Sequence, residues 1–134
     1  MTPSNKGVDG VGKPLTGCSV LVVEDEYLIA RDISSALRAQ GAHVVGPCPN
    51  AEVALAVLEH PDPINGAVID VNLRGVRSFK LAKTLEERGI RFVIATGYDE
   101  EVLPAALADK PRCPKPIDYD QLIMMLHDEM GSCH

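Results

Sequence analysis

Carboxylate, hydroxyl and ammonium side chains stand at the carboxyl ends of four short apolar segments of this chain. They are Glu24, Asp25, Asp70, Thr96 and Lys115. If the four segments are parallel strands of one sheet, these side chains meet along a single edge, which is where open parallel sheets bind ligands. The sequence therefore predicts one site built from residues that lie far apart in the chain.

Three carboxylates at one edge would carry a charge of about −3, which is costly to bury unless a cation neutralises it. Hard oxygen ligands suit Mg²⁺, and such an ion together with Lys115 would bring the site close to neutral. A phosphoryl group could then be held by the metal, Lys115 and the hydroxyl of Thr96, because its charge is spread over its equatorial oxygens. Asp70, the single carboxylate at its strand end, is the candidate nucleophile.

Each of these residues also has a purely structural explanation when it is taken by itself. A single Asp at a strand end, such as Asp25 or Asp70, commonly caps a helix or belongs to a turn. Lys115 could be a solvated charge, and Thr96 before Gly97 could be part of a turn. The functional interpretation depends on all five residues falling at strand ends in one register.

Short apolar segments rich in β-branched residues alternate along the chain with segments of helical periodicity. The predicted strands are 19–23, 43–46, 66–71, 92–95 and, by position more than by composition, 112–114. The predicted helices are 27–40, 51–58, 78–88, 99–109 and 119–130, and Pro104 shortens the fourth of them. Asn50 and Ser78 are candidate N-caps, Asp118 precedes the last helix, and Gly41 and Gly89 are candidate helix stops.

Strands that alternate with helices of about 10 to 15 residues form βαβ units with right-handed crossovers. The predicted fold class is therefore α/β, a doubly wound parallel sheet with helices on both faces. The second strand ends in Gly46 and Pro47, with no ionisable side chain, which favours a place at the edge of the sheet. The other four strand ends would then surround one crevice.

The composition is that of one globular domain. Of the 134 residues, 46% are apolar and 24% charged, and the net charge of −6 argues against nucleic acid or an anionic membrane as the main partner. We expect a flexible leader over 1–16, the domain over 17–130 and a tail over 131–134. No apolar run reaches the roughly 18 residues of a membrane span, so we expect a cytoplasmic protein.

The four cysteines lie far apart in the sequence and form no C-x-x-C pair. They are Cys18, Cys48, Cys113 and Cys133. This spacing is typical neither of zinc ligands nor of a dense disulfide framework. We therefore expect all four to be free thiols in a reducing cytosol.

Four segments resemble the receiver domain of two-component response regulators, and the resemblance extends over residues 18–130. The segments are VLVVEDE at 20–26, AVIDVNLRG at 67–75, IATG at 94–97 and PKP at 114–116. The resemblance implies a flavodoxin-like, five-stranded sheet with the strand order 2-1-3-4-5. It also implies that Asp70 is the phosphoacceptor.

The same resemblance implies a Mg²⁺ site and a switch. The ion would be bound by Asp25, Asp70 and the backbone carbonyl of Asn72, with Glu24 contributing through water. Lys115 would bind the phosphoryl group and precede a cis peptide bond, the kind of bond that proline makes accessible. The hydroxyl at the end of the fourth strand, that of Thr96, would be the switch.

The chain departs from the common receiver pattern in two places. Arg112 stands where typical receivers have an aromatic switch residue, three positions before the lysine. The run FVIATGYDE over 92–100 resembles the FAT-GUY subgroup of mostly single-domain receivers, with Ile94 where that subgroup has Phe and with a reduced or mobile fourth helix. Tyr98, or the loop around it, is the candidate to replace the missing aromatic residue.

The resemblance implies a stand-alone phosphoacceptor module and not an enzyme, apart from its own phosphotransfer and autodephosphorylation. A sensor histidine kinase would supply the phosphoryl group. The signal would leave through protein contacts, to a histidine phosphotransfer protein or another downstream protein. The domain would be a monomer or a phosphorylation-dependent dimer.

Two other functions stay open. A Mg²⁺-dependent phosphoryl-transfer enzyme also pairs a first-strand Glu with a later acidic motif, although such sites generally have Asp-x-Asp where this chain has Asn72. A degenerate receiver would bind its partners without being phosphorylated. Flavin binding on the same class of fold is disfavoured, because Glu24, Asp25 and Glu26 would repel a phosphate after the first strand.

Overall fold

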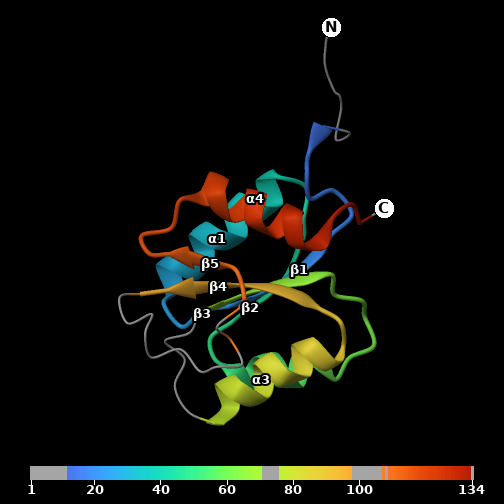
Figure 1. The fold of residues 1–134 in the computed structure, drawn as a ribbon, viewed down its shortest axis with the longest axis vertical. Coiled ribbons are helices and arrows are strands. Elements are labelled where there is room, and N and C mark those ends of the chain that lie inside the picture. Colours follow the sequence, from blue (N-terminus) through green and yellow to red (C-terminus); the bar gives the residue numbers. More distant parts are fainter. Residues whose placement is uncertain (1–11, 71–75, 98–106, 108, 134) are drawn as a thin grey trace, which may run out of the picture.

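A five-stranded parallel sheet runs through the middle of the molecule (Figure 1). This computed structural model describes residues 12–70, 76–97, 107 and 109–133. The order β2-β1-β3-β4-β5 confirms the predicted topology, and every neighbouring pair is parallel. The strands are β1 (Ser19–Val23), β2 (His43–Cys48), β3 (Gly66–Asp70), β4 (Arg91–Thr96) and β5 (Arg112–Pro114).

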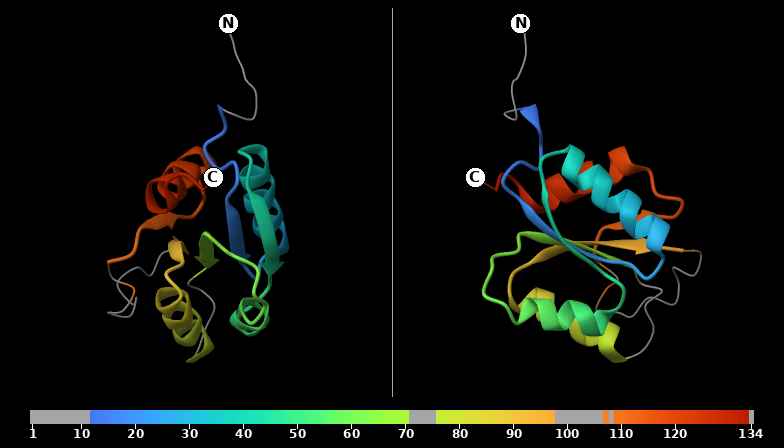
Figure 2. Two further views of the ribbon diagram at one scale, coloured as in Figure 1. Left: turned by 90° about the vertical axis from the view of Figure 1, so that its right-hand side faces the viewer. Right: turned by 180° about the vertical axis from the view of Figure 1, so that it is seen from behind.

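Helices cover both faces of the sheet, as Figure 2 shows from two further directions. The pair α1 and α4 lies on one face, and the pair α2 and α3 lies on the other. Among the residues that the structure describes, no helix has the length and apolar composition needed to cross a membrane. The helices are α1 (Tyr27–Ala39), α2 (Ala51–Leu58), α3 (Val76–Glu87) and α4 (Tyr119–Met130).

Two apolar layers hold the helices to the sheet. Alternate residues of β1 point to opposite faces, so Leu21 belongs to the layer under α2 and α3 while Val22 belongs to the layer under α1 and α4. Strands buried on both faces read as continuous apolar runs, which is the pattern of β1, β3 and β4. Full burial of each large apolar side chain contributes about 1.5–3 kcal/mol, so these layers set the positions of the strand ends.

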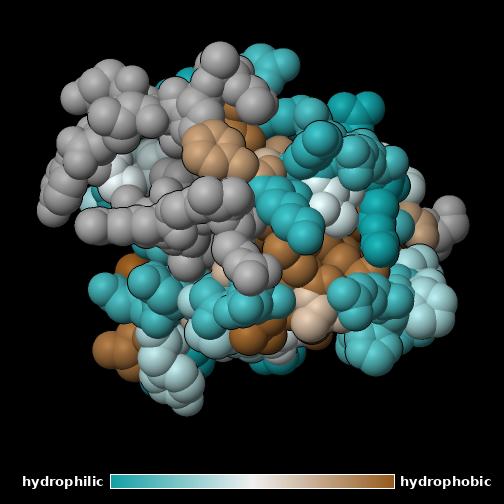
Figure 3. Space-filling model, turned by 90° about the horizontal axis from the view of Figure 1, so that it is seen from below, coloured by the Kyte–Doolittle hydropathy of each residue, from teal (hydrophilic) through white to brown (hydrophobic). Residues whose placement is uncertain are grey.

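The outer surface of α2 and α3 is mixed in polarity. Figure 3 shows this side of the molecule from below, with apolar side chains lying between hydrophilic ones. The exposed large apolar residues described on these two helices are Val53 and Phe79. Scattered exposed apolar residues are normal on soluble domains.

Most predicted helix ends are confirmed by backbone geometry. Asn50 accepts a hydrogen bond from the Val53 N–H at 2.8 Å, and Asp118 accepts one from the Gln121 N–H at 3.2 Å. Gly41 has φ +96°, a conformation that favours glycine after a helix. The predicted N-cap at Ser78 is wrong, because the backbone is already helical from Val76. The predicted helix over 99–109 lies almost entirely outside the described residues.

The packed part of the chain begins before β1. Leu15 is fully buried in the layer under α1 and α4, and its N–H donates to the Gln40 carbonyl at 3.0 Å. Thr16 lies so close to Gly41 that a Cβ there would come within 2.6 Å of the Thr16 hydroxyl. Packing therefore extends into the last residues of the predicted leader.

A disulfide joins Cys18 at the start of β1 to Cys133 after α4. The prediction of four free thiols is wrong for this pair, whereas Cys48 and Cys113 are free and buried. The two bonded residues are 115 positions apart, but the fold brings their Cα atoms to 5.0 Å, inside the usual range for a disulfide. The spacing of the cysteines in the sequence does not indicate that these two lie close together in the fold.

We expect Cys133→Ser to lower the free energy of unfolding by about 3–5 kcal/mol under oxidising conditions, because closing so long a loop restricts the unfolded chain. Urea unfolding followed by circular dichroism measures the loss. Ser132→Ala, on the same tail, is the matched control and should change little. Equal stability of wild type and Cys133→Ser without reductant would contradict the prediction.

Candidate functional site

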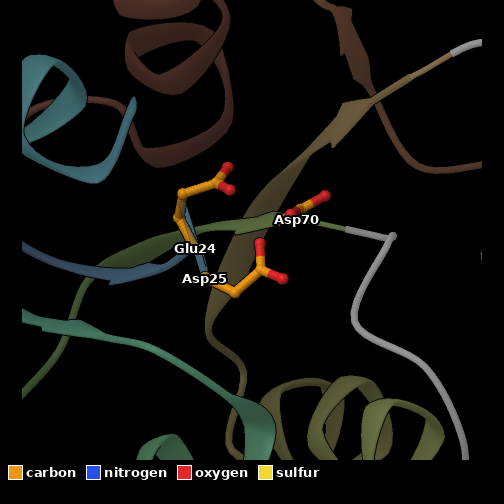
Figure 4. Close-up of side chains that lie close together, drawn as sticks. All are labelled: Glu24, Asp25 and Asp70. Carbon is orange, nitrogen blue, oxygen red and sulfur yellow. The ribbon is translucent and has the colours of Figure 1, made fainter. Parts of the chain in front are cut away.

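The predicted site residues that the structure describes all lie at one edge of the sheet. Glu24 and Asp25 follow β1, Asp70 ends β3, Thr96 ends β4, and Lys115 follows β5. The strands that carry them are neighbours, because β2 takes the edge position beside β1. Figure 4 shows the three carboxylates directed past the ends of β1 and β3.

The three carboxylates form a close cluster of mixed exposure. Oxygen atoms of Glu24, Asp25 and Asp70 all lie within 4.8 Å of one another. Glu24 and Asp70 are buried, with exposed fractions of 3% and 1%, whereas Asp25 is exposed. The cluster therefore has a buried side against the sheet and an open side toward solvent.

Backbone hydrogen bonds hold the cluster and the lysine in place. The Glu24 N–H donates to the Cys48 carbonyl at 2.9 Å, which ties the end of β1 to β2. The Glu26 N–H donates to Oε2 of Glu24 at 3.1 Å. On the other side, the Lys115 N–H donates to the Thr96 carbonyl at 2.8 Å. Lys115 and Thr96 are thus positioned together across β4 and β5.

Lys115 supplies a positive charge to the site. Its Nζ lies 3.1 Å from Oε1 of Glu24 and 3.4 Å from Oδ2 of Asp70. Burial alone would lower the pKa of Lys115, but the two carboxylates outweigh this effect and raise that pKa above its ordinary value. Lys115 is therefore held in its charged form.

Burial and the nearby Asp70 carboxylate disfavour the ionised form of Glu24. Its pKa is raised to about 7, because burial and the neighbouring Asp70 carboxylate together outweigh the lowering effects of the Glu26 N–H and Lys115. A carboxyl group with this pKa is partly protonated at neutral pH. A divalent cation would relieve the repulsion and favour the ionised form.

Thr96, the last residue of β4, places a hydroxyl group at the same edge of the sheet. Thr96 is 1% exposed, and its Oγ1 has no hydrogen-bond partner among the described residues. A buried hydroxyl without a partner costs free energy, so such a group commonly has a functional explanation. Here the hydroxyl belongs to the strand end next to Asp70, where it is available to a ligand's oxygen atom.

The donor set fits Mg²⁺. Oxygens on opposite sides of an octahedral Mg²⁺ are about 4 Å apart, and the ion usually keeps several waters and takes one or two carboxylates. A cluster of carboxylate oxygens within 4.8 Å is close to this size, and exposed Asp25 leaves room for water. Asp25 and Asp70 could bind directly, with Glu24 acting through water.

Some predicted features lie beyond what the structure describes, and one is confirmed. Asn72 and Tyr98 are outside the described residues. The Lys115–Pro116 peptide bond is cis, as expected. Arg112, at the position where an aromatic residue is usual, is half-buried on β5 and pairs in register with Ile94.

Two features of the site were not predicted. One is the Glu26 N–H bond to Glu24, and the other is the ion pair in which Lys115 lies closer to Glu24 than to Asp70. The first follows from a backbone turn after β1, which the acidic run at 24–26 only suggests. The second depends on side-chain placement, for which the sequence offers no signal.

The chain resembles curated proteins in sequence, although no model of a protein family matches it. The chain is 32% identical over 84 residues to the aerobic respiration control protein ArcA of Escherichia coli strain K12, which covers 62% of this chain and 34% of ArcA. It is 27% identical over 118 residues to the sensor protein TorS of the same strain, covering 84% of the chain and 13% of TorS. The chain thus spans a minor part of either relative.

Solved structures share the fold over most of the chain. SdrG from Sphingomonas melonis Fr1 is 36% identical with a TM-score of 0.71, over 84% of this chain and 94% of the SdrG chain. SdrG has also been solved in a BeF3-activated conformation, at 35% identity. A response regulator receiver protein from Sinorhizobium medicae WSM419 has a TM-score of 0.74 at 20% identity, over 88% and 98% of the two chains.

We expect the stability of the metal-free protein to fall between pH 5 and 8 through Glu24. Its pKa is about 7 in the fold against an ordinary 4.5, so the folded state binds the proton more tightly, and stability is lost as pH rises. At roughly 1.4 kcal/mol per unit, this loss is at most about 3 kcal/mol. Unfolding in the presence of a chelator, measured at several pH values, should show it.

Glu24→Gln should remove this part of the pH dependence, whereas Glu59→Gln, on the exposed end of α2, should keep it. Identical pH profiles of wild type and Glu24→Gln would show that Glu24 titrates normally. Adding Mg²⁺ to the wild type should also flatten the profile, because the ion keeps Glu24 ionised.

Proposed function

Because the chain belongs to the receiver-domain family of response regulators, we propose that it accepts a phosphoryl group on Asp70 from a phosphohistidine of a sensor histidine kinase. The observation that carries this proposal is the arrangement around Asp70. A buried carboxylate lies within 3.4 Å of a lysine ammonium, beside two further carboxylates and a buried hydroxyl that has no hydrogen-bond partner in the part of the chain that the structure describes. These groups match the needs of a phosphoryl group and a divalent cation.

In the proposed step, an oxygen of the Asp70 carboxylate attacks the phosphorus in line with the bond to histidine. The O–P bond forms as the P–N bond breaks, and the electron pair of the P–N bond stays on the imidazole nitrogen. The imidazole leaves as a neutral ring, protonated on its other nitrogen. The product is an acyl phosphate on Asp70.

Two other side chains would hold the transferred group. The Nζ of Lys115, already beside Asp70, would bind one of the equatorial oxygens, and it stays charged because its pKa is raised. The Thr96 hydroxyl would donate a hydrogen bond to a second oxygen and so find the partner that it lacks among the described residues. Mg²⁺, held by Asp25 and Asp70 with Glu24 through water and the backbone carbonyl of Asn72, would neutralise charge on the phosphoryl oxygens.

The proposed output is a changed surface and not a chemical product. Phosphorylation adds negative charge and new acceptor oxygens at the sheet edge, which draws Lys115 and Thr96 toward Asp70. The likeness to SdrG, which has a BeF3-activated conformation, supports a domain with two states. The domain would act by itself in the cytoplasm, as a monomer or phosphorylation-dependent dimer, and pass its signal to a histidine phosphotransfer protein or another protein.

The decisive experiment is intact-mass analysis after incubation with a small phosphodonor such as acetyl phosphate. With Mg²⁺ the wild type should gain one phosphate, and with a chelator it should gain none. Asp70→Asn should gain none under either condition. Asp128→Asn, on the exposed last turn of α4, is the matched control and should behave as wild type.

The outcomes separate the alternatives. No phosphate on the wild type would refute the phosphoacceptor function and favour a domain that binds partners unphosphorylated. Equal phosphate on wild type and Asp70→Asn would refute the assignment of the nucleophile. Continuous release of inorganic phosphate at an enzyme's rate would favour the phosphoryl-transfer enzyme.

We expect Asp25→Asn to weaken Mg²⁺ binding by on the order of tenfold or more, which corresponds to about 1.4 kcal/mol or more. Asp25 is exposed, so this change should leave the stability of the fold nearly unaltered. Isothermal titration with MgCl2 measures the affinity. Asp120→Asn, an exposed residue of α4, should bind as wild type, and an unchanged affinity of Asp25→Asn would exclude Asp25 as a ligand.

A further inference from the structure

The Cys18–Cys133 disulfide lies at the opposite end of the sheet from the carboxylate cluster. Cys18 precedes the first residue of β1, whereas Glu24 follows its last residue. In Figure 1 the C-terminal tail comes back beside the segment that leads into β1. The bond therefore ties the amino end of the central strand to the carboxyl end of α4.

The two bonded cysteines differ in their burial. Cys18 is fully buried in the layer under α1 and α4. Cys133 is partly exposed, on a tail that leaves α4 at Gly131 (φ +69°) and has no regular secondary structure at 131–133. Cys133 packs partly against the same layer, and it is the one of the two with surface open to solvent.

The other two cysteines are not in a disulfide and are less suited to thiol exchange. Cys48 and Cys113 are buried free thiols, and burial raises the pKa of each. A thiol with a raised pKa is a poor nucleophile at neutral pH because little thiolate is present. Thiol chemistry in this chain should consequently be confined to the Cys18 and Cys133 pair.

We propose that Cys18 and Cys133 form a reversible thiol–disulfide exchange site for small thiols and disulfides of the glutathione class. Exchange requires that a thiol can reach one sulfur of the bond, and a partly exposed cysteine on a tail without regular secondary structure meets this requirement better than a buried one. This site makes no use of Asp70 and does not depend on the proposed function.

Glutathione is the only reactant besides the protein that this exchange requires. A glutathione thiolate attacks Sγ of Cys133, the bond between the two protein sulfurs breaks, and its electron pair goes to Sγ of Cys18, which takes a proton. A second glutathione thiolate then attacks the glutathione sulfur of the mixed disulfide, and Cys133 leaves as a thiolate that takes a proton. Two glutathione thiols are oxidised to one disulfide, and the protein pair is reduced by two electrons.

The bond closes a ring that passes through the carboxylate cluster. At one end of the sheet Lys115, which precedes α4, pairs with Glu24 after β1 at 3.1 Å. At the other end Cys133, after α4, is bonded to Cys18 before β1. Reduction opens this ring and removes the covalent link at the carboxyl end of α4.

The test is equilibration of the full chain in glutathione buffers from fully reduced to fully oxidised, followed by acid quenching and alkylation of the denatured protein. The number of alkylated cysteines should change from four to two, because the chain has four cysteines and two of them are free in the structure. Peptide mapping should place the change on Cys18 and Cys133. Cys48→Ser should keep the transition, and Cys133→Ser should abolish it.

Two outcomes would overturn the proposal. Four reactive thiols at every ratio would show that the pair does not form the bond, and two at every ratio would show a permanent bond closed to exchange. Hydrogen exchange supplies a second readout. Amides of 128–133 should exchange at least about tenfold faster in the reduced form, and equal rates would show that the bond does not hold the end of α4.

Discussion

Repulsion among three carboxylates is the constraint around which the rest of this domain is arranged. Two like charges at 4 Å interact with about 4 kcal/mol at an intermediate effective dielectric, and two of the three groups here are nearly inaccessible to water. The fold tolerates this because Lys115 contacts both buried carboxylates and because apolar layers cover both faces of the sheet. The same repulsion creates affinity for a divalent cation, so the cost to stability and the capacity to bind have one origin.

The register of the strands determines which side chains meet at the edge of the sheet. Val23 pairs with Ile69, Asp70 with Ala95, and Thr96 with Pro114. Because side chains alternate between faces, a slip of one residue would turn buried side chains to the other face and displace a carboxylate from the edge. The ends of β1 and β3 also meet where the strand order reverses, which is the ligand-binding position of doubly wound sheets.

Features of the fold that depend on neighbouring residues could be predicted from the sequence. Asn50 caps α2 because its side chain reaches an N–H only three residues away, and the apolar runs marked strands buried on both faces. The start of α3 at Val76 could not be predicted, because no capping residue in the sequence marks that boundary. The disulfide could not be predicted either, since Cys18 and Cys133 are 115 positions apart and are close only in the folded chain.

An ion pair and a disulfide connect the two ends of the β1 segment with the segments on either side of α4. The ion pair of Lys115 with Glu24 responds to charge, so a metal ion or a phosphoryl group at the edge would alter it. The bond of Cys18 with Cys133 responds to thiols and is indifferent to charge. Since the ion pair lies before α4 and the disulfide lies after it, the helix is held at both ends by interactions that different ligands control. A change at either end therefore alters how firmly α4 is held without requiring the sheet to move.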